Sequence, residues 1–378
     1  MRTIVGASLL TAVGIGGCVE QRFDIDLVVT RAEALGDGVL QYNYGTDVDP
    51  VDDTAASGKV FATGLKVAID ATTIQFEGEA LGAVVGFGRS AVLDIPDGGT
   101  LTVPLLLAPL VAPGLVSSRT GTVDDACVVA DDNGALFFMG GSGATRDGTV
   151  FDTGFKVRDF SAGAFAGLAN PACAAHAGKV AVVDGRTAMV FDVDGNSDIV
   201  DLGFIDVPAG TIAVPRSDGQ LWVVDGDNDI FRVDSAGAST LIERPSGERT
   251  SGLEVTTNDS LVVVVGGALI YVDDRILNLG PAQTLGRRLQ QVFVFDGDTI
   301  SVIENASTTV VKTVSFPALS SFGLLSDDRV VALTAAGQFV DEAGAYPGRA
   351  QQRVVVLPGD VVLLAGGGGG GFDGIGFR

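Results

Sequence analysis

Clusters of Asp and Asn on glycine-containing turns are the residues of this sequence best suited to chemistry. Alternating carboxylates on such a turn can wrap a calcium ion, which prefers several oxygen ligands. No cluster matches a complete EF-hand loop, and Asp and Asn also favour turns through their own local hydrogen bonds. Calcium therefore stands beside a purely structural role. The candidate ligands are Asp192, Asp194, Asn196, Asp198, Asp225, Asp227 and Asp229, and another acidic run occupies 47–53.

Histidine is scarce, which narrows the catalytic chemistry that the chain can support. His176 is the only histidine in the sequence. A HExxH zinc site needs two histidines, and a Ser-His-Asp triad would depend on this single one. The sequence also contains no GxSxG nucleophile elbow. We therefore interpret His176 as a hydrogen-bonded structural residue, and we assign no catalytic residue.

The N-terminus reads as a targeting segment that ends at the first cysteine. Residues 4–15 are apolar or small, a length typical of a signal-peptide core and too short to span a bilayer. The run continues as IGGC at 15–18, which resembles a bacterial lipobox. This resemblance implies a signal peptide at 1–17, lipid on Cys18 and a tether at 18–22. An ordinary secretory signal is the alternative.

The lipobox resemblance also implies an address. The chain would be anchored in the cell envelope of a Gram-negative bacterium through lipid, with palmitate among the acyl chains. Residue 19 is Val rather than Asp, which by analogy with enterobacterial sorting favours the outer membrane. The other cysteines, Cys127 and Cys173, would then lie in an oxidising compartment where a disulfide can form. Two buried thiols are the alternative.

The overall charge excludes one class of partner. The formal net charge is −23 at pH 7, which argues against binding nucleic acid or anionic lipid surfaces, since both are polyanions. Hydrophobic residues make up 46% of the chain and charged residues 19%, so a sizeable core is expected rather than disorder. We expect a monomer whose protein or glycan partner the sequence does not identify.

The strand signals predict an all-β chain whose first domain covers 23–112. The runs are short, rich in β-branched and aromatic residues, and separated by Gly, Asp and Asn. Along 23–29 buried and polar residues alternate as expected for a strand with one wet face. Six or seven such runs suggest an immunoglobulin-like β-sandwich. The proline-containing stretch 103–116 reads as a strand that continues into a linker.

A repeated motif of four apolar residues and a turn predicts the second domain, 114–378. Four antiparallel strands in roughly 40 residues are typical of a β-propeller blade, and we expect seven blades. Segment 114–118 is predicted to complete the last blade and close the ring. The motif copies are LFFMGG (136–141), VAVVDG (180–185), LWVVDG (221–226), VVVVGG (262–267), ISVIEN (300–305), VVALTA (330–335) and VLLAGG (362–367).

Double glycines after three of these apolar runs, at 140–141, 266–267 and 366–367, resemble the kelch repeat. The other copies depart from it, so the resemblance is degenerate. Some kelch-type propellers are copper oxidases, but their metal centre needs two histidines and this chain has one. The order of lipobox, sandwich and propeller resembles predicted myxobacterial lipoproteins, a resemblance that implies no activity.

Two functions follow. The first is a non-enzymatic, lipid-anchored binding or scaffold protein of the envelope. The alternative is a calcium-dependent hydrolase resembling a lactonase, which would need acidic side chains converging in the channel. We place the inner strands at ACVVA, ACAAH, TIAVP, GLEVT, QQVFV, FGLLS and RVVVL, and Glu254 is the only acidic residue in them. This shortage favours the binding protein.

Overall fold

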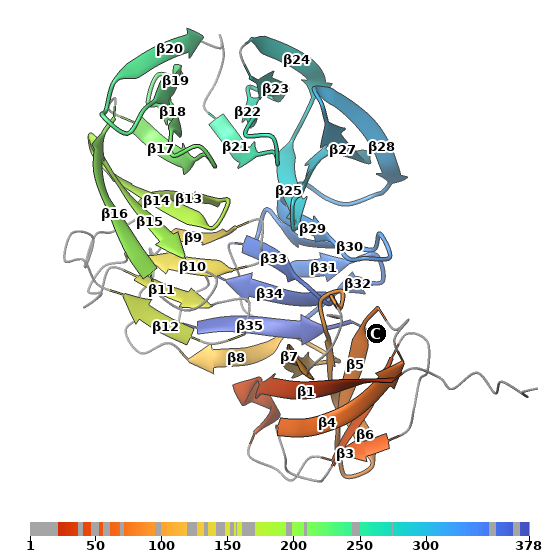
Figure 1. Cartoon of the computed structure of the whole chain (residues 1–378). Helices are drawn as coiled ribbons and strands as arrows, with labels where there is room; N and C mark the ends of the chain where they lie inside the picture. The colour runs from red at the N-terminus through yellow and green to blue at the C-terminus, as the bar shows by residue number, and fades with distance from the viewer. Residues whose placement is uncertain are drawn as a thin grey trace, which may run out of the picture.

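The computed structural model is all-β, as the strand signals predict. The only helix among the described residues is η1 (Glu33–Leu35), and no helix there is long and apolar enough to cross a membrane. The strands form an N-terminal sheet and a ring of meanders (Figure 1). The structure describes residues 22–36, 41–46, 53–55, 61–68, 72–94, 100–118, 127–131, 135–140, 148–151, 155, 157–160, 171–193, 199–207, 210–243, 250–273, 275–347, 353–365 and 371–377.

The N-terminal part is one seven-stranded sheet with the order β3-β2-β5-β6-β7-β1-β4. Alternation of buried and wet side chains gives it a core on one face, and Ile25 and Leu27 are fully buried. Its strands are β1 (Arg22–Arg31), β2 (Gln41–Thr46), β3 (Asp53–Ala55), β4 (Phe61–Ala68), β5 (Ile74–Ala80), β6 (Ala83–Arg89) and β7 (Thr100–Pro109).

Strand β7 makes this sheet continuous, which differs from the two separate sheets of an immunoglobulin-like sandwich. It pairs in parallel with β1 up to Leu107 and then antiparallel with β6 through Ala108 and Pro109. The two halves still enclose a common core, because Leu105 of β7 packs with Tyr42 of β2. A single long apolar strand thus serves both halves.

The strands from β8 onward form, in the part of the chain described, five four-stranded sheets and one eight-stranded sheet. The eight-stranded sheet is two meanders joined by a short parallel pairing of β25 with β29. We call the meanders units 1 to 7 in chain order, and each is antiparallel with its inner strand first. Units 1 to 4 comprise β9 (Cys127–Ala130), β10 (Leu136–Met139), β11 (Gly148–Phe151), β12 (Val157–Phe160); β13 (Ala172–His176), β14 (Lys179–Asp184), β15 (Thr187–Val193), β16 (Ile199–Asp206); β17 (Gly210–Pro215), β18 (Leu221–Asp225), β19 (Ile230–Val233), β20 (Ser239–Glu243); and β21 (Thr250–Val255), β22 (Leu261–Val265), β23 (Ala268–Val272), β24 (Ile276–Pro281).

The last three units complete the ring. Unit 7 takes its outer strand from early in the chain, since β8 pairs antiparallel with β35. This is segment 114–118, which the sequence assigns to that place. Units 5 to 7 comprise β25 (Thr284–Arg288), β26 (Gln291–Phe295), β27 (Thr299–Glu304), β28 (Ser307–Thr313); β29 (Leu319–Leu324), β30 (Val330–Thr334), β31 (Phe339–Asp341), β32 (Gly344–Ala345); and β33 (Arg353–Leu357), β34 (Val361–Ala365), β35 (Gly371–Gly376), β8 (Gly114–Ser118).

Buried clusters between neighbouring units hold the ring together. Phe137 of unit 1 packs with Val182 of unit 2, and equivalent clusters join each later pair. The last cluster joins Leu363 of unit 7 to Phe138 of unit 1 and closes the ring. Each unit therefore buries both faces only through its neighbours, as repeat architectures require.

Unit 5 differs from its predicted strand assignment. We placed QQVFV as the inner strand and ISVIE as the second, but the inner strand is β25, and these runs are β26 and β27. Strand β25 has the sequence TLGRR, too charged to match the apolar motif. It nevertheless packs closely against β29. Glycine at 286 permits this approach, since a Cβ there would lie 2.6 Å from the carbonyl oxygen of Phe322.

The N-terminal sheet docks directly on unit 7. Leu106 and Ala108 belong to the cluster that joins units 7 and 1, and Arg89 Nη1 lies 2.8 Å from Asp360 Oδ2. A Cβ on Gly376 of β35 would lie 2.6 Å from the carbonyl oxygen of Phe87 in β6. The predicted linker is correspondingly short, since β7 ends at Pro109 and β8 begins at Gly114.

Candidate functional site

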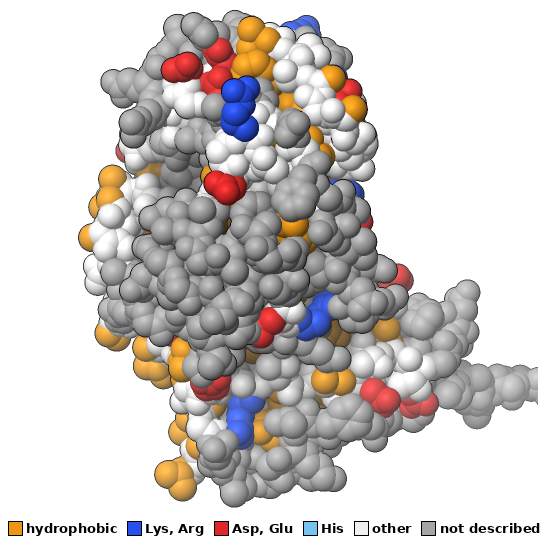
Figure 2. All heavy atoms as spheres, turned by 90° about the vertical axis from the view of Figure 1, so that its left-hand side faces the viewer, with side chains coloured by type: hydrophobic (Ala, Val, Ile, Leu, Met, Phe, Trp, Pro, Cys, Tyr) orange, Lys and Arg blue, Asp and Glu red, His pale blue; other side chains and the backbone are white. Residues whose placement is uncertain are grey.

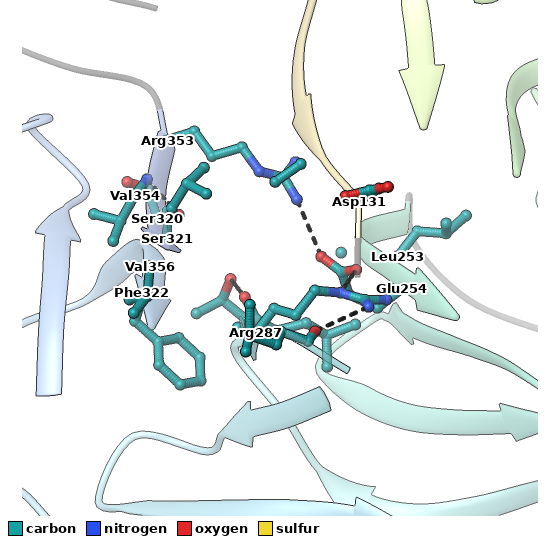
Figure 3. Close-up of a pocket in the computed structure, with 17 residues that line it drawn as sticks. Asp131, Leu253, Glu254, Arg287, Ser320, Ser321, Phe322, Arg353, Val354 and Val356 are labelled. Carbon is teal, nitrogen blue, oxygen red and sulfur yellow. Dashed lines mark hydrogen bonds and ion pairs between the residues drawn. The ribbon is translucent and has the colours of Figure 1, made fainter. Parts of the chain in front are cut away.

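A pocket of about 160 Å³ lies among the inner strands at the centre of the ring (Figure 3). Strands β21, β25, β29 and β33 line it, and Ala130 and Asp131 at the end of β9 complete the wall. The pocket therefore draws on units 1, 4, 5, 6 and 7. Such a convergence of separate repeats is where a propeller can place side chains that no single repeat brings together.

Glu254 of β21 is held between two arginines from other units. Arg287 Nε donates to Glu254 Oε2 at 2.9 Å, and Arg353 Nη2 donates to Oε1 at 3.1 Å. These residues belong to units 4, 5 and 7, so the second ion pair bridges the channel (Figure 3). Both carboxylate oxygens accept charge-assisted hydrogen bonds, which are the strong ones.

The two arginines differ in how many of their donors are used. Arg287 also donates from Nη2 to the Val255 carbonyl at 2.6 Å and from Nη1 to the Leu289 carbonyl at 3.2 Å. Its side chain is 10% exposed, whereas that of Arg353 is 33% exposed. The bond to Glu254 is the only polar contact of the Arg353 side chain with the described residues. Arg353 therefore keeps donors directed to solvent or ligand.

The pocket is also lined by a hydroxyl group, that of Ser321. The Val354 backbone N–H, next to Arg353, donates to Ser321 Oγ at 3.1 Å. Within the described residues the Ser321 hydroxyl proton has no acceptor, so it can serve a ligand. The rest of the wall includes Leu253, Leu285, Phe322 and Val356, which also pack in the clusters between units, so polar atoms contribute more of the pocket surface than apolar atoms.

Some of the predicted calcium ligands lie within the described residues and the others lie outside them. Asp225 Oδ1 accepts the backbone N–H groups of Asp227 and Asp229, each at 2.9 Å, and so stabilises the turn after β18. Asp192 lies in β15, opposite Lys179. Asp194, Asn196 and Asp198 lie outside the described residues, as does most of 47–53. No group of three His, Cys, Asp or Glu side chains suited to a metal occurs among the residues described.

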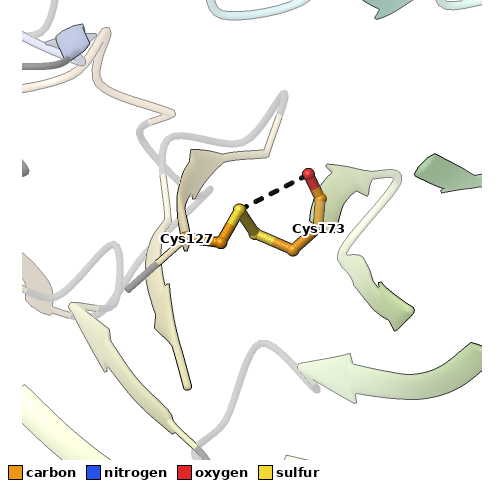
Figure 4. Close-up of a disulfide and its surroundings, with 2 residues drawn as sticks. All are labelled: Cys127 and Cys173. Carbon is orange, nitrogen blue, oxygen red and sulfur yellow. Dashed lines mark hydrogen bonds between the residues drawn. A yellow bond between two sulfur atoms is a disulfide. The ribbon is translucent and has the colours of Figure 1, made fainter. Parts of the chain in front are cut away.

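Cys127 and Cys173 form a disulfide in the structure (Figure 4). Their Cα atoms are 6.0 Å apart, within the range for a disulfide. The bridge joins the inner strands β9 and β13 and so links unit 1 to unit 2. Cys18, the predicted lipid attachment site, lies outside the described residues.

His176 takes part in a network around Asp259, in the turn between β21 and β22. The His176 ring, 2% exposed, places Nε2 at 3.1 Å from Asp259 Oδ1, which also accepts the Ser217 backbone N–H at 2.8 Å. The Ser217 hydroxyl donates to Oδ2. The Asp259 carbonyl accepts Trp222 Nε1 at 2.7 Å and Arg216 Nη1 at 2.9 Å. This network, the Asp259 network, ties units 2, 3 and 4 together.

The charge of Asp259 is stabilised despite its partial burial. Burial alone would raise the pKa of the carboxyl, but the hydrogen bonds from Ser217 and the charge of Arg216 hold that pKa below its ordinary value. Arg216 in turn lies over the Trp222 ring at 5.2 Å, as does Arg232. Both carboxylate oxygens and the carbonyl oxygen of Asp259 thus accept hydrogen bonds from groups of the protein itself.

The outer surface is less distinctive. On the face shown in Figure 2, the described acidic, basic and apolar side chains are scattered and form no single patch of one kind. The central pocket is therefore the best-built candidate site.

No protein-family model matches the chain, and no curated protein matches it in sequence. Solved structures are similar in fold. A streptogramin B lyase superposes over 69% of this chain and 96% of its own, with 8% identity and a TM-score of 0.50. The Cps50 (Swd1) β-propeller domain of Myceliophteria thermophila covers 69% of this chain and 99% of its own, with 13% identity and a TM-score of 0.49.

YCF48 from Cyanidioschyzon merolae covers 70% of this chain and 99% of its own, with 11% identity and a TM-score of 0.48. At such low identity the likeness to the lyase shows the fold alone, and the ring is a β-propeller. It assigns no reaction and no ligand to this chain.

Of the three charged residues that pair in the pocket, Glu254, Arg287 and Arg353, only the first was singled out from the sequence. Glu254 was expected on an inner strand, and it lies there. Arg287 was missed because unit 5 was assigned one strand out of place. A signal was available: VFVFDG at 292–297 has the four apolar residues and turn of the repeat motif, which would have placed TLGRR innermost.

Proposed function

We propose that the protein is a non-enzymatic, lipid-anchored binding protein of the cell envelope, built as a seven-bladed propeller with a docked N-terminal sheet. The observation that carries the binding role is the central pocket, where Arg353 presents donors that no described residue uses. The lipobox-like IGGC at 15–18 supports the anchor, and the disulfide agrees with an oxidising compartment.

The geometry favours binding over calcium-dependent hydrolysis. Glu254 is the only acidic residue on the described inner strands, and both of its oxygens accept hydrogen bonds from guanidinium groups. A calcium ion would have to compete with two cations for this carboxylate. The carboxylate of Glu254 is thus already engaged by two guanidinium groups and is poorly placed to hold a hard cation.

The anchor is tested by metabolic labelling with an alkyne analogue of palmitate in a Gram-negative host. We expect the wild-type chain to incorporate the label and sediment with membranes, and Cys18→Ser to do neither. An unlabelled wild-type chain would contradict the anchor.

The binding role is tested by a thermal-shift screen of small metabolites on the wild type and on Leu253→Trp. Leu253 lines the pocket, and a larger apolar side chain there should fill it. We expect at least one compound to raise the Tm of the wild type but not of the variant. A screen in which every stabilising compound acts equally on both proteins would contradict a channel site.

A further inference from the structure

We propose that the central pocket binds a small organic monocarboxylate, with its carboxylate on Arg353 and Ser321 and its apolar part against the channel wall. The inference deepens the proposed function and rests on it. The structure offers a cationic donor, a hydroxyl donor and an apolar surface in one cavity of about 160 Å³.

The first step concerns Arg353 itself. Its guanidinium carries five N–H donors in a fixed plane, and Glu254 takes only one of them, through Nη2. A carboxylate matches the spacing of two parallel guanidinium donors, so a bidentate pair can form while the bond to Glu254 persists. Arg287 is less suited to this part, because three of its five N–H donors are taken by Glu254, Val255 and Leu289 and its side chain is only 10% exposed.

The second step concerns the hydroxyl. Ser321 Oγ is fixed in place by accepting the backbone N–H of Val354, the residue that follows Arg353. Its own proton has no acceptor among the described residues and is available to an acceptor in the pocket. Arg353 and Ser321 come from the inner strands of units 7 and 6, so the pair exists only in the assembled ring.

The third step concerns the number of charges that the pocket tolerates. The ionisable side chains that line it are Arg287 and Arg353, which are positive, and Asp131 and Glu254, which are negative. They balance, so a ligand with two negative charges would meet the two carboxylates without a matching excess of cations. A ligand with one negative charge adds less uncompensated charge than a ligand with two, which favours a carboxylate over a phosphate monoester.

The last step concerns the remainder of the ligand. Leu253, Leu285, Phe322 and Val356 contribute the apolar part of the cavity lining, and contact with it stabilises an apolar group by removing that group from water. A carboxylate without such a group, such as acetate, gains only the polar contacts. A short-chain or aromatic acid gains both.

The test is isothermal titration calorimetry of the full chain at pH 7 and low salt with hexanoate and benzoate. The comparison ligands are hexanamide, benzamide and phenyl phosphate. We expect at least one of the two acids to bind at least tenfold more tightly than its amide and than phenyl phosphate. Failure of both acids to bind, equal affinity for the amides, or tighter binding of phenyl phosphate would each overturn the inference.

Variants locate the site. We expect Arg353→Gln to weaken binding of the acid at least tenfold and Arg353→Lys to fall between, since lysine keeps the charge but loses the planar donor pair. Glu254 keeps Arg287 as a partner in both, so folding should be preserved. Arg275, an exposed arginine in the segment leading into β24, provides the control, and Arg275→Gln should bind like the wild type.

An unchanged affinity in Arg353→Gln would overturn the inference. Its failure is distinguishable from failure of the proposed function. If the metabolite screen yields a neutral or cationic ligand that Leu253→Trp excludes, the channel remains a binding site and only the ligand class is wrong.

Discussion

Two carboxylates of unit 4 lie close in sequence yet have different surroundings. Asp259 accepts hydrogen bonds from units 2 and 3, and both of its carboxylate oxygens are occupied by groups of the protein. Glu254 also joins three units, but one of its partners, Arg353, keeps donors directed into a cavity. The comparison teaches that an ion pair between repeats becomes a candidate site when one partner is left incomplete beside open space.

Among the contacts that join units, removal of the disulfide between units 1 and 2 should have the largest effect on stability. The disulfide closes a loop with a sequence separation of 46, and loop-closure entropy suggests that it stabilises the fold by about 4 kcal/mol. We expect the Cys127→Ala, Cys173→Ala double variant to lose most of this free energy of unfolding in urea titrations. Affinity for hexanoate should not change, because neither cysteine lines the pocket. A large loss of affinity in a variant that is still fully folded would show that the disulfide between units 1 and 2 affects the geometry of the pocket.

Removal of the Asp259 carboxylate should be the next largest effect. Asp259→Ala leaves His176 and two donors of Ser217 without their acceptor, and we expect a loss of about 3 kcal/mol in the free energy of unfolding. Asp328→Ala is the matched control, since both residues have φ of 62° but the Asp328 side chain is 51% exposed. We expect a loss there of about 1 kcal/mol. Equal losses would mean that the Asp259 network adds nothing beyond its turn.

Substitution of Glu254 should change ligand affinity as well as stability, whereas substitution of Asp259 should change stability alone. Glu254→Gln keeps the shape of the pocket but removes a negative charge shared by two arginines, and its amide NH2 cannot accept their hydrogen bonds, so we expect a loss of about 2 kcal/mol in the free energy of unfolding. Affinity for a monocarboxylate should rise about fivefold, since repulsion within the pocket falls. Calorimetry and urea titration on the same sample separate the two effects. A severe loss of stability with no gain in affinity would make Glu254 a structural join like Asp259.

Acid should weaken the Asp259 network. The pKa of Asp259 is lowered in the folded state, so its stabilising contribution is complete above the unfolded pKa and is lost as the pH falls through the lower, folded value. We expect the free energy of unfolding to decline from about pH 4 downward. Asp259→Asn, which tolerates the positive φ, should flatten part of this decline. An unchanged slope in the variant would assign the acid sensitivity to other carboxyls.

Much of the architecture could be predicted because the same apolar pattern recurs in each unit and indicates the same buried strand each time. The apolar runs at 180–183 and 262–265 became second strands because each can bury both faces only between neighbours. The place of 114–118 was predictable because an open last unit would leave an unpaired edge. Unit 5 failed where its inner strand, TLGRR, lacks the apolar character of the others.

The site was less predictable for a related reason. Arg353 and Glu254 lie on strands three units apart, and only closure of the ring brings them within 3.1 Å. Nothing in the local sequence around Arg353 marks it as different from Arg288, whose Nη1 donates to Asp328 on the rim. The Cys pair was easier, since its members occupy matching places on successive inner strands.

The borrowed strand β8 has a consequence for how the chain acquires its fold. Its partner β35 follows units 1 to 6 in the chain, so β8 and the apolar side chains of the N-terminal sheet that pack on unit 7 lack their contacts until the last unit is present. Pairings between such distant segments form slowly. A chain that ends within unit 6 would thus expose the unpaired edge of β8.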